Sequence, residues 1–295
     1  MKGSKEIRQR IHAVANTAKI TRAMQLVASS KMKKAQDLAI HSRPYLFHLA
    51  ELVRCFSQAE KRDIQHPFFE KREVVHRGIL LVGTERGLCG AMNTNVFKEI
   101  AIAGSHARWM TIGKKAAQYV SRCDGELLAS FCVSDRVDFS ELRPIYESLS
   151  RAYVQKTIDT VEVVFPAFIN TLVQIPVERH VLPMSDFQSE FESILQYSKM
   201  SKEDFQSDPR EMIFEPSVAV LLEQLSQTFF QYHLYQILLE AKASEQSSRM
   251  VAMKTATDNA ENLLKELSLK YNKVRQSVIT NEIVELSMSN TNVAE

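Results

Sequence analysis

The last third of the chain carries its clearest periodic pattern of apolar residues. Residues 217–288 contain no glycine and no proline. Within this stretch, apolar residues recur at alternating spacings of four and three: Ala260, Leu264, Leu267, Tyr271, Val274 and Val278. Such a repeat marks the seam of a coiled-coil helix, because it keeps one edge turned toward a partner helix. An unbroken helix of this length would measure roughly 100 Å. It should therefore protrude from any compact domain and need a partner to cover its seam.

We expect that partner at the other end of the chain. Residues 4–43 again lack glycine and proline, and two stripes at helical spacing follow one another after a shift in phase: Ile7, Ile11, Val14 and Ala18, then Ala28, Met32, Ala35 and Ala39. Small side chains in these stripes would let two backbones approach closely. The pattern predicts that residues 1–60 and 210–288 pair as a long antiparallel coiled coil, a rod. Pro44 leaves open whether the first helix kinks, restarts or runs on.

The middle of the chain differs from the two ends in its glycine content and in its pattern of apolar residues. Seven of the eight glycines lie within residues 78–125, and the eighth is Gly3. Strands are expected at 74–82, 107–112, 126–133, 161–168 and 171–181, and helices at 93–103, 114–122 and 139–158. This alternation predicts a Rossmann-like α/β domain over residues 73–184 with a largely parallel sheet, and the last two strands are close enough for a hairpin. Residues 185–216 are polar and should connect the domain back to the rod.

The net charge of +2 conceals an asymmetry. Residues 1–43 hold ten Lys or Arg against Glu6 and Asp37, a balance of +8, which leaves −6 for the rest of the chain. A basic rod favours an acidic partner, which could be a nucleic acid, a membrane surface or an acidic protein sleeve. For any single lysine, a solvated helix face is an equally good explanation.

Motifs for catalysis or cofactor binding are weak. A glycine-rich turn at residues 83–90 follows a strand and precedes a helix, as a phosphate-binding loop would, but it matches neither GxxxxGK[ST] nor GxGxxG, and Glu85 would repel a phosphate. A structural turn is therefore the favoured interpretation. The eight histidines show no metal-ligand spacing, and no nucleophile elbow is present. We expect no catalytic site, no cofactor and no metal. No stretch is apolar enough to span a membrane.

Three blocks of the sequence resemble the ATP synthase gamma subunit, the central shaft of the F1 sector. The first comprises residues 5–11 (KEIRQRI) and 16–24 (NTAKITRAM), and the second residues 86–90 (RGLCG) and 93–95 (NTN). The third comprises residues 243–246 (ASEQ), 249–254 (RMVAMK), 256–260 (ATDNA) and 271–282 (YNKVRQSVITNE). The blocks lie at both ends and in the middle, so the resemblance covers the whole chain. Ala18 and Glu85 depart from the family pattern, which usually has Gln and Asp there.

The resemblance implies a non-catalytic rotor in a proton-translocating ATP synthase. Its partners would be the alpha, beta and epsilon subunits and the membrane c-ring, with no nucleic acid. It would lie on the cytoplasmic side of a bacterial inner membrane, held there through the complex. By position, Met24, Arg275, Gln276 and Thr280 match family residues that contact the beta subunit. The alternative from the residues alone is a basic coiled-coil protein that binds nucleic acid.

Overall fold

The computed structural model describes residues 2–59, 66–70, 72–101, 107–123, 125–184, 215 and 217–291. The chain divides into two compact units, one formed by Met1–Ser29 with Arg249–Glu295 and the other by Ser30–Ser248. The two long terminal helices contribute to both units. The predicted domain limits of 1–60, 73–184 and 210–288 follow the course of the chain instead of these units, and they stay a prediction.

Two long helices form the ends of the chain, as predicted. Helix α1 spans Lys2–Ala59 and helix α6 spans Val218–Thr291. Helix α1 runs on through Pro44 without ending. A proline inside a helix costs about 3 kcal/mol, because it removes one hydrogen bond and crowds the preceding turn. Burial of the following residues offsets this cost, since Leu46, Phe47, Ala50 and Val53 are almost completely inaccessible.

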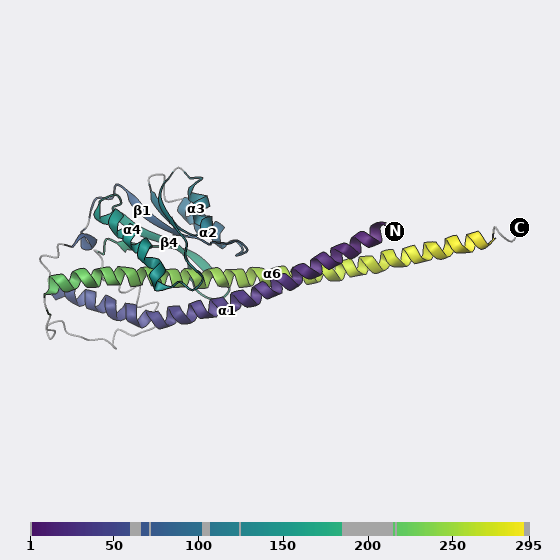
Figure 1. Ribbon diagram of the computed structural model, residues 1–295, viewed down its shortest axis with the longest axis horizontal. Coiled ribbons are helices and arrows are strands. Elements are labelled where there is room, and N and C mark those ends of the chain that lie inside the picture. The colour runs from purple at the N-terminus through teal and green to yellow at the C-terminus, as the bar shows by residue number, and fades with distance from the viewer. Residues whose placement is uncertain are drawn as a thin grey trace. The chain divides into compact units, whose positions relative to one another are not determined.

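In the first unit, α1 and α6 pair antiparallel along a seam (Figure 1). The seam of α6 keeps the predicted spacing, and its buried or half-buried members are Met253, Thr257, Ala260, Leu264, Leu267, Tyr271, Val274 and Val278. The predicted shift in phase of α1 is wrong. Thr21 and Gln25 occupy the two seam positions after Ala18, so the repeat continues unbroken to Ala28. The polar side chains of these two seam residues hide the continuous repeat in the sequence.

The second unit contains a five-stranded sheet of order β3-β2-β1-β4-β5. Its strands are β1 (Arg77–Val82), β2 (Arg108–Ile112), β3 (Glu126–Phe131), β4 (Thr160–Phe168) and β5 (Gln174–Leu182). The first four are parallel, and β5 pairs antiparallel with β4 as the predicted hairpin. A parallel sheet whose first strand is central, with later strands added on both sides, confirms the Rossmann-like fold class.

The short helices lie close to their predicted positions, and differences have local causes. They are α2 (Met92–Ala101), α3 (Lys114–Val120) and α4 (Arg143–Val154), with 3-10 turns η1 (Pro67–Phe69) and η2 (Phe139–Leu142). The helix predicted over 139–158 begins as η2 and becomes α4 where Pro144 lies in the first helical turn. It ends before Lys156, whose φ of 58° is left-handed. Strand β1 starts later than predicted, because Asp159 accepts the backbone N–H groups of Val75 and His76 (3.0 and 2.8 Å).

Helices cover both faces of the sheet, as a parallel sheet requires (Figure 1). One face packs Ile79, Leu81 and Trp109 against α2 and α3. The other packs Leu80 and Phe165 against α4, α6 and the second-unit part of α1. Helix α6 is thus part of the core of this unit. None of the described helices is long and apolar enough to cross a membrane.

Candidate functional site

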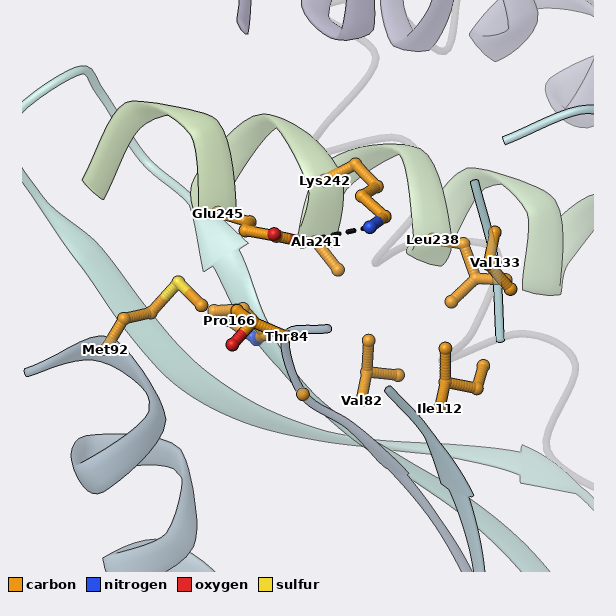
Figure 2. A pocket seen from close by; sticks show the side chains of 11 residues that line it. Val82, Thr84, Met92, Ile112, Val133, Pro166, Leu238, Ala241, Lys242 and Glu245 are labelled. Carbon is orange, nitrogen blue, oxygen red and sulfur yellow. Dashed lines mark hydrogen bonds and ion pairs between the residues drawn. The ribbon is translucent and has the colours of Figure 1, made fainter. Parts of the chain in front are cut away.

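A Rossmann-like sheet usually binds its ligand in the crevice beyond the carboxyl ends of its strands, at the point where the strand order switches. Here that point lies between β1 and β4. Helix α6 lies across it, and the described residues there line a small cavity of about 10 Å³, enough for about one water molecule. Figure 2 shows Val82 lying opposite Ala241 of α6 across this cavity, which Thr84 and Lys242 also line. Among the described residues, the chain's own helix α6 thus occupies the crevice.

The glycine-rich loop at residues 83–90 is folded back on helix α2. Asn93 Nδ2 donates to Thr84 Oγ1 (2.7 Å), and the Thr84 N–H donates to Asn93 Oδ1 (3.3 Å). Leu88 and Gly90 adopt left-handed φ values of 66° and 61°, which tighten the turn. The Leu88 side chain is 60% exposed. These bonds agree with the interpretation of the loop as a structural turn.

Glu85 of the glycine-rich loop lies at the N-terminus of helix α3, the helix that follows β2. It accepts hydrogen bonds from Lys114 Nζ (2.8 Å) and from the Lys114 backbone N–H (3.2 Å), at the first residue of α3. The Lys114 ammonium lowers the pKa of the Glu85 carboxyl, and a hydrogen bond with Glu85 raises the pKa of the Cys132 thiol. The orphan N–H at this helix end is thus satisfied by the protein's own carboxylate.

Helix α6 is hydrogen-bonded to three loops that follow the carboxyl ends of the strands. Ser248 Oγ donates to the Cys89 carbonyl in the glycine-rich loop (2.7 Å). Ser247 Oγ donates to the Thr171 carbonyl in the β4–β5 turn (2.7 Å). Asp135, which follows β3, accepts from Gln246 Nε2 (3.4 Å). We call this contact of α6 residues 242–248 with the three loops the joint.

Charged groups extend the joint. Lys242 Nζ lies 3.0 Å from Glu245 Oε2 and 3.8 Å from Asp135 Oδ1. Lys31 of α1 reaches the same aspartate at 2.5 Å. Lys242 and Glu245 are both buried, so the loss of either partner would leave a desolvated charge. These contacts lie close together on one short segment of α6. They therefore fix both the position of the α/β domain along α6 and its rotation about the axis of that helix.

Sequence reasoning missed the joint, although a signal existed. Residues 240–247 include six polar or charged side chains, and all six are buried: Glu240, Lys242, Ser244, Glu245, Gln246 and Ser247. A polar run in a helix without glycine or proline reads as a solvated face. Its burial depends on a carbonyl and a carboxylate supplied from loops 76 and 111 residues away in the chain.

The residues predicted to contact a beta subunit all lie in the first unit, at two separate positions along the paired helices. Met24 of α1 is half-buried, three residues beyond Thr21, whose hydroxyl meets that of Thr257. Arg275, Gln276 and Thr280 are exposed on α6, and Thr280 Oγ1 donates to the Gln276 carbonyl (2.9 Å). Arg275 is 18 residues beyond Thr257, a rise of about 27 Å along a helix. The structure thus does not bring Met24 together with the other three.

Among the described residues, no group of three or more His, Cys, Asp or Glu side chains could hold a metal ion. The described part of the chain therefore offers a mechanical joint and an exposed paired-helix surface as its candidate functional features.

A Rossmann-like domain whose ligand crevice is occupied by one of two paired terminal helices is typical of a structural subunit. The comparisons agree. A family model described as ATP synthase matches residues 3–289. The ATP synthase gamma chain of Opitutus terrae is 42% identical over 287 residues, which are 97% of this chain and 97% of that protein. The chain of the same name from Methylacidiphilum infernorum is 40% identical, covering 97% of this chain and 98% of that one. The chain belongs to the ATP synthase gamma chain family.

Solved structures match the fold. A chain of the Euglena gracilis mitochondrial ATP synthase, in a structure of its OSCP, F1 and c-ring parts, superposes with a TM-score of 0.66 at 15% identity, covering 99% of this chain and 95% of that chain. A chain of the central stalk and c-ring structure from Tetrahymena thermophila gives a TM-score of 0.59 at 22% identity, covering 80% of this chain and 99% of that chain. The paired helices and the α/β domain are thus the architecture found in these assemblies.

Proposed function

We propose that this chain is the central rotary shaft of an F-type ATP synthase and couples ion flow through the membrane sector to ATP synthesis or hydrolysis. The chain itself is a non-catalytic subunit. The observation that carries this proposal, beside the family membership, is that one uninterrupted helix, α6, both pairs with α1 in the first unit and is bonded through the joint to the α/β domain in the second.

The coupling follows from differential contact. A shaft whose sides differ in shape and charge stabilises a different arrangement of the surrounding subunits in each orientation, and the coupling free energy is the difference between those contacts. The chemistry stays on the partner subunits. In this chain, the two chemically different helices of the first unit supply unequal sides.

The proposed partners are the alpha and beta subunits around the paired helices, and the epsilon subunit and c-ring at the α/β domain. Met24, Arg275, Gln276 and Thr280 are the proposed contacts with the beta subunit. The exposed position of the last three supports this assignment, and so does the basic character of residues 1–43 against an acidic surface. The proposed location is the cytoplasmic side of a bacterial inner membrane. The family assignment favours this function over a nucleic-acid-binding coiled coil.

Arg275→Glu tests the beta-subunit contact. We expect ATP-driven proton pumping in membranes carrying this variant to fall more than ATP hydrolysis does, because a reversed charge alters a contact that depends on rotor orientation. Lys273→Glu is the matched control, since Lys273 is exposed, basic and two residues away on the same helix. Equal pumping per ATP in both variants and the natural protein would contradict the assignment of Arg275.

Ser248→Ala tests the joint. Removal of a hydroxyl that donates to a loop carbonyl should cost about 1 kcal/mol. Amides of residues 83–90 should then exchange hydrogen roughly fivefold faster, which corresponds to that free energy. Ser268→Ala, at an exposed serine of α6, should change nothing there. Unchanged exchange in Ser248→Ala would show that the hydroxyl does not hold the loop.

A further inference from the structure

The turn that follows strand β3 is held in an unusual conformation. The Val137 N–H donates to the Ser134 carbonyl (3.3 Å), which closes the turn, and the Ser134 N–H donates to Glu141 Oε2 (2.8 Å). Val137 has a left-handed φ of 53°, which a β-branched residue rarely adopts because its side chain crowds the backbone. That side chain is buried in the core of the second unit. Such a conformation persists where the surroundings hold it, and it is common at functional sites.

This turn presents Asp135 to both long helices. The Asp135 carboxylate accepts hydrogen bonds from Lys31 Nζ of α1 (2.5 Å) and from Gln246 Nε2 of α6 (3.4 Å). Lys242 Nζ of α6 lies 3.8 Å from the same carboxylate. Lys31 and Gln246 both lie within two residues of the limits of the second unit. One side chain of the α/β domain is thus bonded to α1 and to α6 close to the ends of their second-unit segments.

The charges around Asp135 balance. Lys31 and Lys242 carry two positive charges, and Asp135 and Glu245 carry two negative charges. Lys242 and Glu245 are buried, with Nζ and Oε2 3.0 Å apart (Figure 2). The side chains of Lys31 and Asp135 are 42% and 44% exposed, so their ion pair alone contributes little to the free energy of folding. What Asp135 supplies is therefore a defined direction more than stability.

Direction matters because the packing of α1 against the sheet is largely apolar. Leu46, Leu49, Ala50 and Val53 of α1 belong to the same core as the strands. Apolar burial is non-directional, so it resists separation of two elements better than it resists sliding or rotation. A charge-assisted hydrogen bond needs a defined distance and angle, so it resists both.

We propose that Asp135 is a positioning residue that fixes the α/β domain to α1 and α6 together, so that torque on the domain turns the two helices as one body. This inference rests on the proposed function for the existence of that torque. Ser247 and Ser248 bond loops of the domain to α6, whereas the Asp135 carboxylate also bonds α1. Without this carboxylate, α6 would still be turned through the two serines, and α1 would follow less closely.

The test is the torsional stiffness of the shaft in the purified complex. The surrounding subunits are fixed to a surface, ATP is withheld, and a gold bead is attached to exposed position 115 of the α/β domain through a noncanonical amino acid. Thermal motion turns the bead through a wider range of angles when the link between domain and helices is softer. We expect a wider angular distribution in Asp135→Asn than in the natural protein. Asp138→Asn is the matched control and should change nothing, because Asp138 is exposed in the same loop and its side chain caps no backbone N–H.

A second variant separates positioning from folding. Lys31→Gln removes the bond to α1 and leaves the turn intact, so it should also widen the angular distribution. The double variant with Asp135→Asn should be no wider than Asp135→Asn alone, because both changes remove the same bond. In hydrogen exchange of the same complex, the Ser134 and Val137 amides should exchange roughly threefold faster in Asp135→Asn, the effect of losing an exposed ion pair. A residue that only stabilised the fold would change exchange without changing the angular distribution.

An angular distribution in Asp135→Asn no wider than in Asp138→Asn would overturn the inference, and so would additive widening in the double variant. If Asp135→Asn does not assemble, the distribution in Lys31→Gln decides the matter, and an unchanged width there refutes the link to α1. Failure of the natural chain to co-purify with ATP synthase subunits, or a bead on the natural complex that does not rotate when ATP is supplied, would instead refute the proposed function. The two failures are thus distinguishable.

Discussion

A buried pair of hydroxyl groups interrupts the apolar seam between α1 and α6. Thr21 Oγ1 and Thr257 Oγ1 are 2.7 Å apart, and the two residues are 9% and 3% exposed. Each hydroxyl also lies within hydrogen-bond distance of a carbonyl of its own helix, that of Ala18 (3.1 Å) or Met253 (2.8 Å). A buried polar seam pair of this kind favours one register, because any slip would place a hydroxyl against apolar side chains.

The perturbation is a double-mutant cycle of Thr21→Val and Thr257→Val. Each single change leaves the opposite hydroxyl against a methyl group. That hydroxyl keeps its intrahelical carbonyl, so the cost should lie near the lower end of the usual penalty, about 1 kcal/mol. The double change replaces both hydroxyls by methyl groups of the same shape and should be nearly neutral. The coupling free energy between the two sites should therefore be about 1–2 kcal/mol.

Native-state hydrogen exchange of the full chain measures this coupling locally. Amides near residues 14–28 and 253–264 should exchange about fivefold faster in each single variant and return toward the natural rate in the double variant. Register is read by a disulfide between Ala18→Cys and Ala260→Cys, which the antiparallel pairing of Thr21 with Thr257 places at one level. That disulfide should form readily with the threonines and less completely with the two valines. Strictly additive exchange effects, or an unchanged disulfide yield in the double valine variant, would refute the reasoning.

Two further predictions concern the α/β domain. Gly125→Ala should destabilise it by about 1–3 kcal/mol in urea unfolding, because an added Cβ would lie 2.1 Å from the Trp109 indole nitrogen. Gly87→Ala is the control, since nothing lies within 4 Å of a Cβ added there. It should change the free energy of unfolding by less than about 0.5 kcal/mol. Comparable losses at both glycines would contradict this. Since Lys114 lowers the pKa of Glu85 below its ordinary 4.5, the pair stabilises the fold above that pH, and the contribution is lost as the pH falls below it. Urea unfolding between pH 6 and pH 3 should therefore show a smaller loss of stability with falling pH in Glu85→Gln than in the natural protein, and an identical pH profile would disprove the linkage.

The sequence by itself determined the two helical ends, their pairing and the alternation of strands and helices. These features depend on local periodicity, which a stretch such as residues 260–278 displays without reference to the rest of the chain. The seam pattern was incomplete where polar residues hold seam positions, as Thr21 and Gln25 do in α1 and Thr257 does in α6.

Tertiary structure alone decided the strand order, the closure of the ligand crevice by α6, and the joint. Ser248 and the Cys89 carbonyl are 159 residues apart in sequence. Neither residue type indicates that the other is its hydrogen-bond partner. A serine in a long helix reads as solvated until the fold supplies a buried acceptor for its hydroxyl. Periodicity is a property of a segment, whereas the partner of a buried polar group is set by where distant segments meet.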